Sequence, residues 1–140
     1  MHKAAEETHQ VWLERTIAEC AGIAGTVHLY NAESDLLELR ASVNIPPPVV
    51  AITRTIPKGK GMAGLAWERQ VPVQTCNLQQ GDNPDVRPGA KAVSAQAAIA
   101  IPVHAADGTL RGVVGIAFAG EREIVGEELA RLTQAAALLP

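Results

Sequence analysis

Three glycines spaced as Gly59-x-Gly61-x-x-Gly64 in this 140-residue sequence match a phosphate-binding pattern. Such a loop can cradle the phosphates of a dinucleotide, but only where it directly follows a strand and opens a helix within a βαβ unit. Here the preceding segment 46–57 contains four prolines, and no parallel crossover follows. We therefore predict a tight turn into a helix and no nucleotide site. Two lysines flank the turn and are expected to be solvated: Lys58 and Lys60.

The two cysteines could support thiol chemistry, but their placement does not favour it. Cys20 and Cys76 lie far apart and form no CxxC pair, so neither a zinc site nor a disulfide framework is implied. Cys76 precedes a segment whose cations are Arg87 and Lys91, and nearby cations activate a thiol. However, residues 77–96 contain no second cysteine that could resolve an oxidised Cys76. Cys20 lies on a helical apolar stripe and is expected in the core.

The histidines and acidic residues form no recognisable catalytic or metal-binding set. His28 and His104 stand alone in predicted strands, and a metal or haem site needs several ligands or a defined axial ligand. Asp82 and Asp85 lie in a segment rich in proline and glycine, where turn capping explains them better than acid–base catalysis. We therefore expect no catalytic residue, no metal and no cofactor.

Composition indicates one globular domain and excludes several classes of partner. The chain has 47% hydrophobic residues, a net charge of −3 and only 3% aromatic residues. No basic stripe is present to bind nucleic acid, and few aromatic side chains are available to stack on bases. No apolar run is long enough to span a membrane, and the first residues lack the apolar core of a signal peptide. We expect a single cytoplasmic domain over residues 1–140, with no nucleic-acid or membrane partner.

Apolar periodicity and turn residues predict an alternation of helices and strands. The Asp107-Gly108 pair between two apolar runs indicates a hairpin, and Pro72 indicates an edge strand. The expected helices cover 3–21, a short turn over 49–54, a segment starting near Gly61, and 125–139. The expected strands cover 24–30, 36–43, 71–74, 97–104 and 110–119, the last two being nearly continuous apolar runs that should be covered on both faces.

The order of these elements resembles a GAF domain, and three local motifs carry the resemblance. The first is Ile56-Pro57-x-Gly59-x-Gly61-x-x-Gly64-x-Ala66, which is similar to the glycine-bearing start of the family's central helix. The second is the apolar run 98–103, followed by Asp107-Gly108 and the run 112–117. The third is the closing amphipathic helix, whose start is acidic through Glu121, Glu123, Glu127 and Glu128. The resemblance covers about Thr8 to Leu139.

The resemblance implies an α+β fold with a central antiparallel sheet of five to six strands. The N- and C-terminal helices would cover one face, while a central helix and the long loop 77–96 would roof a cavity on the other. Strand parity places Thr26, His28 and Tyr30 on one face of their strand without fixing which face looks inward. The predicted ligand-binding residues are Thr26, His28, Tyr30, Met62, Leu65, Cys76, Arg87 and Lys91. The alternative is that His28 and Tyr30 face solvent at the margin of the sheet.

The expected function is that of a non-catalytic sensory or regulatory module that binds a small molecule, mediates dimerisation in signalling, or does both. A thiol enzyme similar to the GAF-type free methionine-(R)-sulfoxide reductases is one alternative, and a purely structural dimerisation module is another. The C-terminal apolar stripe recurs at intervals of four and three residues, which together with Leu13 and Ile17 predicts a homodimer through the terminal helices. The stripe consists of Val125, Leu129, Leu132, Ala136 and Leu139. Alternatively, both helices only cover the sheet.

Overall fold

The computed structural model describes residues 2–75, 97–120 and 123–140, with side chains described from His9 onward. The helices are α1 (His2–Glu19), α2 (Pro47–Ile52), α3 (Gly61–Arg69) and α5 (Gly126–Ala137). The strands are β1 (Ala24–Asn31), β2 (Leu36–Val43), β3 (Thr55–Ile56), β4 (Val73–Thr75), β5 (Ala97–His104) and β6 (Leu110–Phe118). In this part of the chain no helix has the length and apolar character needed to cross a membrane.

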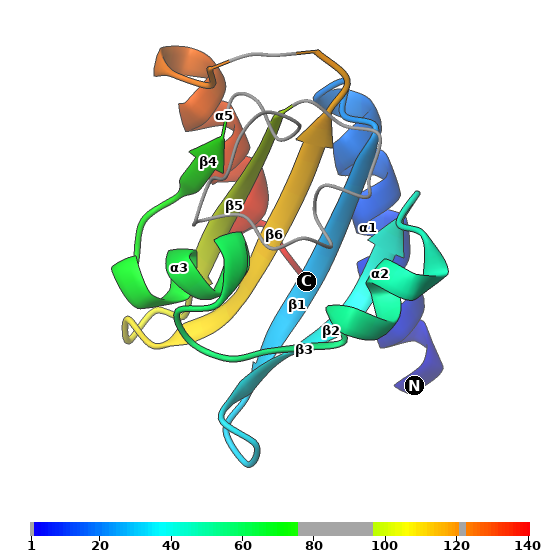
Figure 1. The fold of residues 1–140 in the computed structure, drawn as a ribbon, viewed down its shortest axis with the longest axis vertical. Coiled ribbons are helices and arrows are strands. Elements are labelled where there is room, and N and C mark those ends of the chain that lie inside the picture. Colours follow the sequence, from blue (N-terminus) through cyan, green and yellow to red (C-terminus); the bar gives the residue numbers. More distant parts are fainter. Residues whose placement is uncertain (1, 76–96, 121–122) are drawn as a thin grey trace.

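The strands form one six-stranded antiparallel sheet in the order β3-β2-β1-β6-β5-β4 (Figure 1). The predicted antiparallel α+β architecture is therefore confirmed. β4 occupies an edge, as Pro72 indicated, but it begins at Val73, two residues after the predicted start. A proline has no N–H to donate to the ladder, which accounts for the later start.

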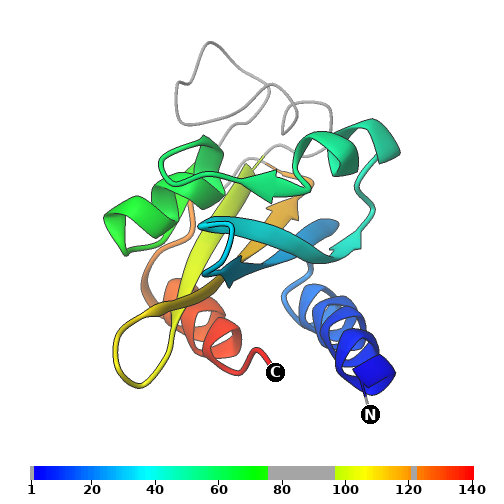
Figure 2. The ribbon, with the colours of Figure 1, turned by 90° about the horizontal axis from the view of Figure 1, so that it is seen from below.

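The two faces of the sheet carry different helices (Figure 2). α1 packs against β1 and β2 and α5 against β5 on one face, whereas α3 packs against β4, β5 and β6 on the other. Val27 and Leu29 of β1 contact the core beneath the terminal helices, as predicted. The long loop that was expected beside α3 lies outside the described residues.

The central strands alternate large and small side chains between the two faces. Ile99 and Ile101 of β5, together with Val114 and Ile116 of β6, point to the core under the terminal helices. The opposite face of the same strands carries smaller residues. These residues form the small-residue floor: Ala98, Ala100, Gly115 and Ala117. Because successive side chains of a strand point to opposite faces, this alternation leaves less side-chain volume on the face that α3 covers.

Both hairpins are fixed by local polar contacts. Between β5 and β6, Gly108 adopts φ +89°, and the side chain of Asp107 accepts bonds from the backbone N–H and hydroxyl of Thr109 at 3.0 and 2.7 Å. These two bonds lower the pKa of the Asp107 carboxyl. The predicted Asp-Gly hairpin is thereby confirmed.

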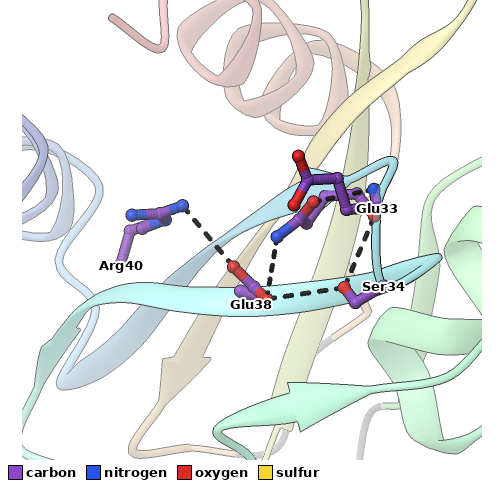
Figure 3. A network of polar contacts seen from close by, with 5 residues as sticks. Glu33, Ser34, Glu38 and Arg40 are labelled. Atoms are coloured by element: carbon purple, nitrogen blue, oxygen red, sulfur yellow. Dashed lines mark hydrogen bonds and ion pairs between the residues drawn. The ribbon is translucent and has the colours of Figure 1, made fainter.

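The β1–β2 turn is held by a carboxylate-centred network (Figure 3). One oxygen of Glu38 accepts bonds from Asn31 Nδ2 at 3.1 Å and from Ser34 Oγ at 3.4 Å, while its other oxygen lies 3.5 Å from the Arg40 guanidinium. The backbone N–H of Glu33 donates to Asn31 Oδ1 at 2.9 Å. The network thus links residues of the turn to β2 at the closed end of the hairpin.

Most residues of the C-terminal apolar stripe are buried within the chain. Leu132, Ala136 and Leu139 are buried in the core under the terminal helices, and Leu129 packs partly against it. Val125 is 57% exposed because it is the extended residue before α5, and the helix begins only at Gly126. The prediction that Val125 lies on the C-terminal helix is therefore wrong.

Candidate functional site

A cavity of about 150 Å³ lies between the sheet and the helices α2 and α3. β1, β5 and β6 provide one wall, which includes Thr26, His28 and the small-residue floor. α2, α3 and their flanking segments provide the other wall. The residues of this second wall are Ile45, Val49, Thr53, Ile56, Lys60, Gly61, Met62 and Ala63. The cavity is thus mainly apolar, with a few polar groups contributed by particular residues.

The cavity exists because the residues on this face of the central strands have small side chains or none. A Cβ placed on Gly115 would lie 2.9 Å from Thr26 Oγ1, so even alanine would require the neighbouring side chain to move. Ala117 lies two residues along the same strand, Ala98 is its partner on β5, and both add only methyl groups. The small-residue floor therefore makes the space that α3 covers.

The glycine motif has a structural role in placing α3 over the cavity. Gly59 and Gly61 adopt φ +84° and +65°, in the left-handed region that side chains disfavour. A Cβ on Gly64 would lie 2.6 Å from the carbonyl oxygen of Pro57, so α3 packs directly on its preceding turn. The predicted tight turn into a helix is confirmed, and it brings Gly61, Met62 and Ala63 to the cavity wall.

His28 is the most buried polar side chain of the cavity wall. Its residue is 2% exposed, and its Nε2 lies 2.8 Å from the carbonyl oxygen of Thr53. A bulge in β2 shifts the register between Val27 and His28, because these residues pair with Ala41 and Leu39 respectively. The alternative that His28 faces solvent at the sheet margin is wrong.

The partner of Nε2 fixes the tautomer of His28. A carbonyl oxygen only accepts, so Nε2 must carry the proton that is donated to Thr53. Burial lowers the pKa of His28, and the smaller opposing effect is the bond to Thr53. The ring is therefore neutral near pH 7, and Nδ1 is left as an acceptor. Nδ1 is buried and has no hydrogen-bond partner among the described residues.

The structure brings three of the predicted site residues together and places two elsewhere. Thr26, His28 and Met62 line the cavity. Tyr30 lies farther along β1, where its ring meets Trp67 edge-on with centroids 5.4 Å apart and its hydroxyl donates to Asp35 at 2.7 Å. That bond raises the pKa of Tyr30. Leu65 packs in the same cluster as Tyr30 and does not line the cavity.

The remaining predicted site residues, Cys76, Arg87 and Lys91, lie outside the described residues. Cys20 is half-buried at the end of α1 and packs against the core under the terminal helices, across the sheet from the cavity. Within residues 2–75, 97–120 and 123–140, no group of three or more histidine, cysteine or acidic side chains could hold a metal ion.

Sequence reasoning missed the small-residue floor and the contribution of α2. The signal for the floor was present in the alternation of Ala98 and Ala100 with Ile99 and Ile101, which was interpreted only as a continuous apolar run. No comparable pattern marked Val49 or Thr53, because α2 is a six-residue helix placed by its contacts rather than by periodicity.

Comparison with known proteins gives one family and several structural relatives. A family model described as GAF domain matches residues 6–139. No curated protein matches the chain in sequence.

Among solved structures, the GAF domain of a phosphoenolpyruvate-protein phosphotransferase from Acinetobacter has a TM-score of 0.77 at 14% identity, covering 96% of this chain and 79% of that one. A type II free methionine-R-sulfoxide reductase from Thermoplasma acidophilum also has a TM-score of 0.77, at 20% identity, covering 98% and 90%. A domain of a putative two-component sensor histidine kinase protein from Sinorhizobium meliloti has a TM-score of 0.73 at 12% identity, covering 96% and 86%. At these identities the likeness concerns the fold.

Proposed function

The chain belongs to the GAF domain family, and we propose that it is a non-catalytic sensory or regulatory module that binds a small molecule in the cavity under α3. The observation that carries the proposal is the cavity itself, which combines an apolar wall with the buried, incompletely bonded imidazole of His28. Concave, mainly apolar pockets with a few placed polar groups are the usual form of small-molecule sites.

The cavity is partly open and its lining is mainly apolar, so a molecule from solution can enter it and cover apolar surface. A buried acceptor without a partner costs about 1–3 kcal/mol, which an apolar side chain in place of His28 would avoid. A bound molecule would fill the space and cover its apolar wall.

A sensory role is supported by the position of the cavity relative to the terminal helices. The cavity lies on one face of the sheet, and α1 and α5 lie on the other. Gly25 and Ile116 each line the cavity. On the other face of the sheet, Gly25 lies against Ile17 of α1, and Ile116 belongs to the core under the terminal helices. Occupancy of the cavity is therefore expected to alter the packing of the terminal helices.

The experiment pairs native mass spectrometry with thermal unfolding. Protein purified under native conditions is examined for a co-purified small molecule, and a collection of cell metabolites is then screened for compounds that raise the melting temperature. A ligand that prefers the folded state must stabilise it.

Two matched variants test whether a ligand that is found binds in the cavity. Ala98→Leu adds volume inside the cavity, whereas Ala106→Leu makes the same change at an exposed turn residue. We expect the first change to abolish the thermal shift and the second to leave it intact. An equal shift in both variants, with Ala98→Leu still folded by circular dichroism, would show that the ligand binds elsewhere.

The competing thiol-enzyme hypothesis has its own test. We propose that thiol chemistry is not the function, since Cys20 lies across the sheet from the cavity. Replacing Cys20 or Cys76 by alanine is therefore expected to leave ligand binding unchanged. Loss of methionine-sulfoxide reduction on the Cys76→Ala change would instead establish the enzyme.

A further inference from the structure

The polar groups of the cavity wall specify a class of ligand, an inference that rests on the proposed function. We propose that the cavity binds a neutral, mainly apolar molecule with one hydrogen-bonding group, and that this group bonds to the hydroxyl of Thr26. The apolar body of the molecule lies on the small-residue floor, where the strands leave room for it.

The walls of the cavity offer a ligand mainly apolar contact. Among the described lining residues, four have polar or charged side chains: Thr26, His28, Thr53 and Lys60. The others are glycine, alanine, methionine or branched aliphatic residues. Removal of apolar surface from water is therefore the main source of affinity that this site can provide.

Two of the four polar side chains already use their hydrogen-bond donors inside the protein. The hydroxyl of Thr53 donates to the carbonyl oxygen of Val49 at 2.8 Å, and His28 Nε2 donates to the carbonyl oxygen of Thr53 at 2.8 Å. The other ring nitrogen of His28 is buried out of reach of solvent, so a ligand in the cavity does not reach it either. Neither side chain has a donor left for a ligand.

The hydroxyl of Thr26, in contrast, is both unbonded and accessible. It has no hydrogen-bond partner among the described residues, and the one side-chain nitrogen or oxygen in that part of the chain that is both unbonded and buried is His28 Nδ1. Gly115 pairs with Thr26 on the neighbouring strand, and a Cβ there would lie 2.9 Å from Thr26 Oγ1. Because glycine has no side chain, the oxygen stays uncovered on the floor of the cavity.

The charges around the cavity favour a ligand without net charge. None of the described lining residues carries a carboxylate that could pair with a cation. Lys60 was expected to be solvated, and it is exposed, although it also lines the cavity. A solvated ammonium group contributes little to binding an anion, whereas removing the anion from water carries a large cost. A neutral molecule avoids that cost.

Four single-ring probes of similar shape test the ligand class. Acetophenone is neutral and has one carbonyl oxygen, isopropenylbenzene has a methylene group in place of that oxygen, benzoate is an anion and benzylamine is a cation. Their dissociation constants with the intact chain are measured by ligand-observed NMR. We expect acetophenone to bind at least about tenfold more tightly than either ion, because a charge removed from water without a buried partner is costly. Binding of either ion as tight as that of acetophenone would overturn the proposal.

Three variants test the hydrogen bond to Thr26. Thr26→Val keeps the shape of the side chain and removes the hydroxyl, so it is expected to weaken acetophenone binding about fivefold without weakening isopropenylbenzene binding. Thr26→Ser keeps the hydroxyl and is expected to retain most of the acetophenone affinity. Thr55→Val makes the same change at an exposed strand residue that does not line the cavity, and it should affect neither probe. Equal weakening of both probes by Thr26→Val would contradict the hydrogen bond.

The outcomes separate this proposal from the proposed function, with circular dichroism checking that each variant is folded. If Ala98→Leu blocks the probes but Thr26→Val does not distinguish them, the cavity is a ligand site and the contact with Thr26 is wrong. If no probe binds, the ligand class is wrong. A co-purified molecule whose thermal shift is lost in Ala98→Leu would then still support the proposed function.

Discussion

Protonation of His28 opposes folding, and this gives a prediction at the residue scale. Burial lowers the pKa of the folded-state ring below the ordinary value of 6.5. Above that pH the ring is neutral in both states and contributes no pH dependence. As the pH falls below about 6.5, the unfolded chain takes up a proton that the folded chain does not, so stability falls by up to about 1.4 kcal/mol per pH unit.

The measurement compares urea unfolding of the wild type with that of the His28→Gln variant between pH 8 and pH 5. We expect the wild type to lose more stability than the variant below pH 6.5, and the two curves to run parallel above it. His104→Gln, which removes an exposed histidine, is the control. Parallel curves over the whole range would mean that His28 takes up its proton equally in both states.

Only some of the residues that line the cavity could be predicted from the sequence. Parity placed Thr26, His28 and Tyr30 on one face, and all three do lie on the face that α3 covers. Tyr30 nevertheless lies beyond the cavity, because two residues of a strand advance by about 7 Å. Which residues reach the cavity depends on the β2 bulge and on the position of α2, and neither has a local sequence signal.

At the scale of elements, one glutamine joins β4 to the segment before α5. Gln74 Nε2 donates to the carbonyl oxygen of Ile124 at 2.7 Å, and the N–H of Ile124 donates to Gln74 Oε1 at 2.8 Å. Ile124 is almost fully buried, so both of its backbone groups depend on this amide. Gln74 thereby ties an edge strand that contacts α3 to the start of the C-terminal helix.

We expect Gln74→Ala to destabilise the protein by about 1–3 kcal/mol, because it leaves two buried backbone groups of Ile124 without partners. The free energy of unfolding is measured by denaturant titration. Gln134→Ala removes an exposed glutamine from α5 and is expected to change it by less than about 0.5 kcal/mol. Similar values for both variants would show that water replaces the side-chain amide.

The elements themselves followed from sequence wherever the signal was local. Asp107-Gly108 fixed one hairpin, and the glycines at 59, 61 and 64 fixed the start of α3. The predicted element boundaries were wrong where they depend on backbone conformation, because apolar periodicity carries no information about it. β4 begins after Pro72, and α5 begins at Gly126, which adopts φ +60° after the extended Val125. The Gln74–Ile124 pair spans 50 residues and has no local pattern.

At the scale of the whole molecule, the homodimer through the terminal helices stays a prediction. Fewer apolar residues are available for its interface than the sequence suggested. Leu132, Ala136 and Leu139 are already buried within the chain. Among the side chains that the structure describes, the exposed large apolar residues on or beside the terminal helices are Val11, at 55%, and Leu138, at 75%, together with Val125. A two-fold interface on this face would have to use them.

We expect sedimentation at micromolar concentration to show a dimer, and Val11→Glu or Leu138→Glu to yield a monomer with little change in melting temperature. Ile52→Glu on α2 is the matched control, because Ile52 is 52% exposed and belongs to the opposite side of the sheet. A wild-type chain that sediments only as a monomer would refute the dimer and leave the terminal helices as covers of the sheet.

The small-residue floor also has a consequence for the response of the protein to hydrostatic pressure. Pressure favours the state of smaller volume, and the volume decrease on unfolding scales with the internal void that unfolding removes. Because this cavity of about 150 Å³ is partly open, the part of it that water leaves empty should lower the pressure at which the unliganded chain unfolds. Ala117→Val fills part of the void and should raise the midpoint pressure, as should a bound ligand. Fluorescence of Trp12 and Trp67 under pressure reports the transition from the two faces of the sheet.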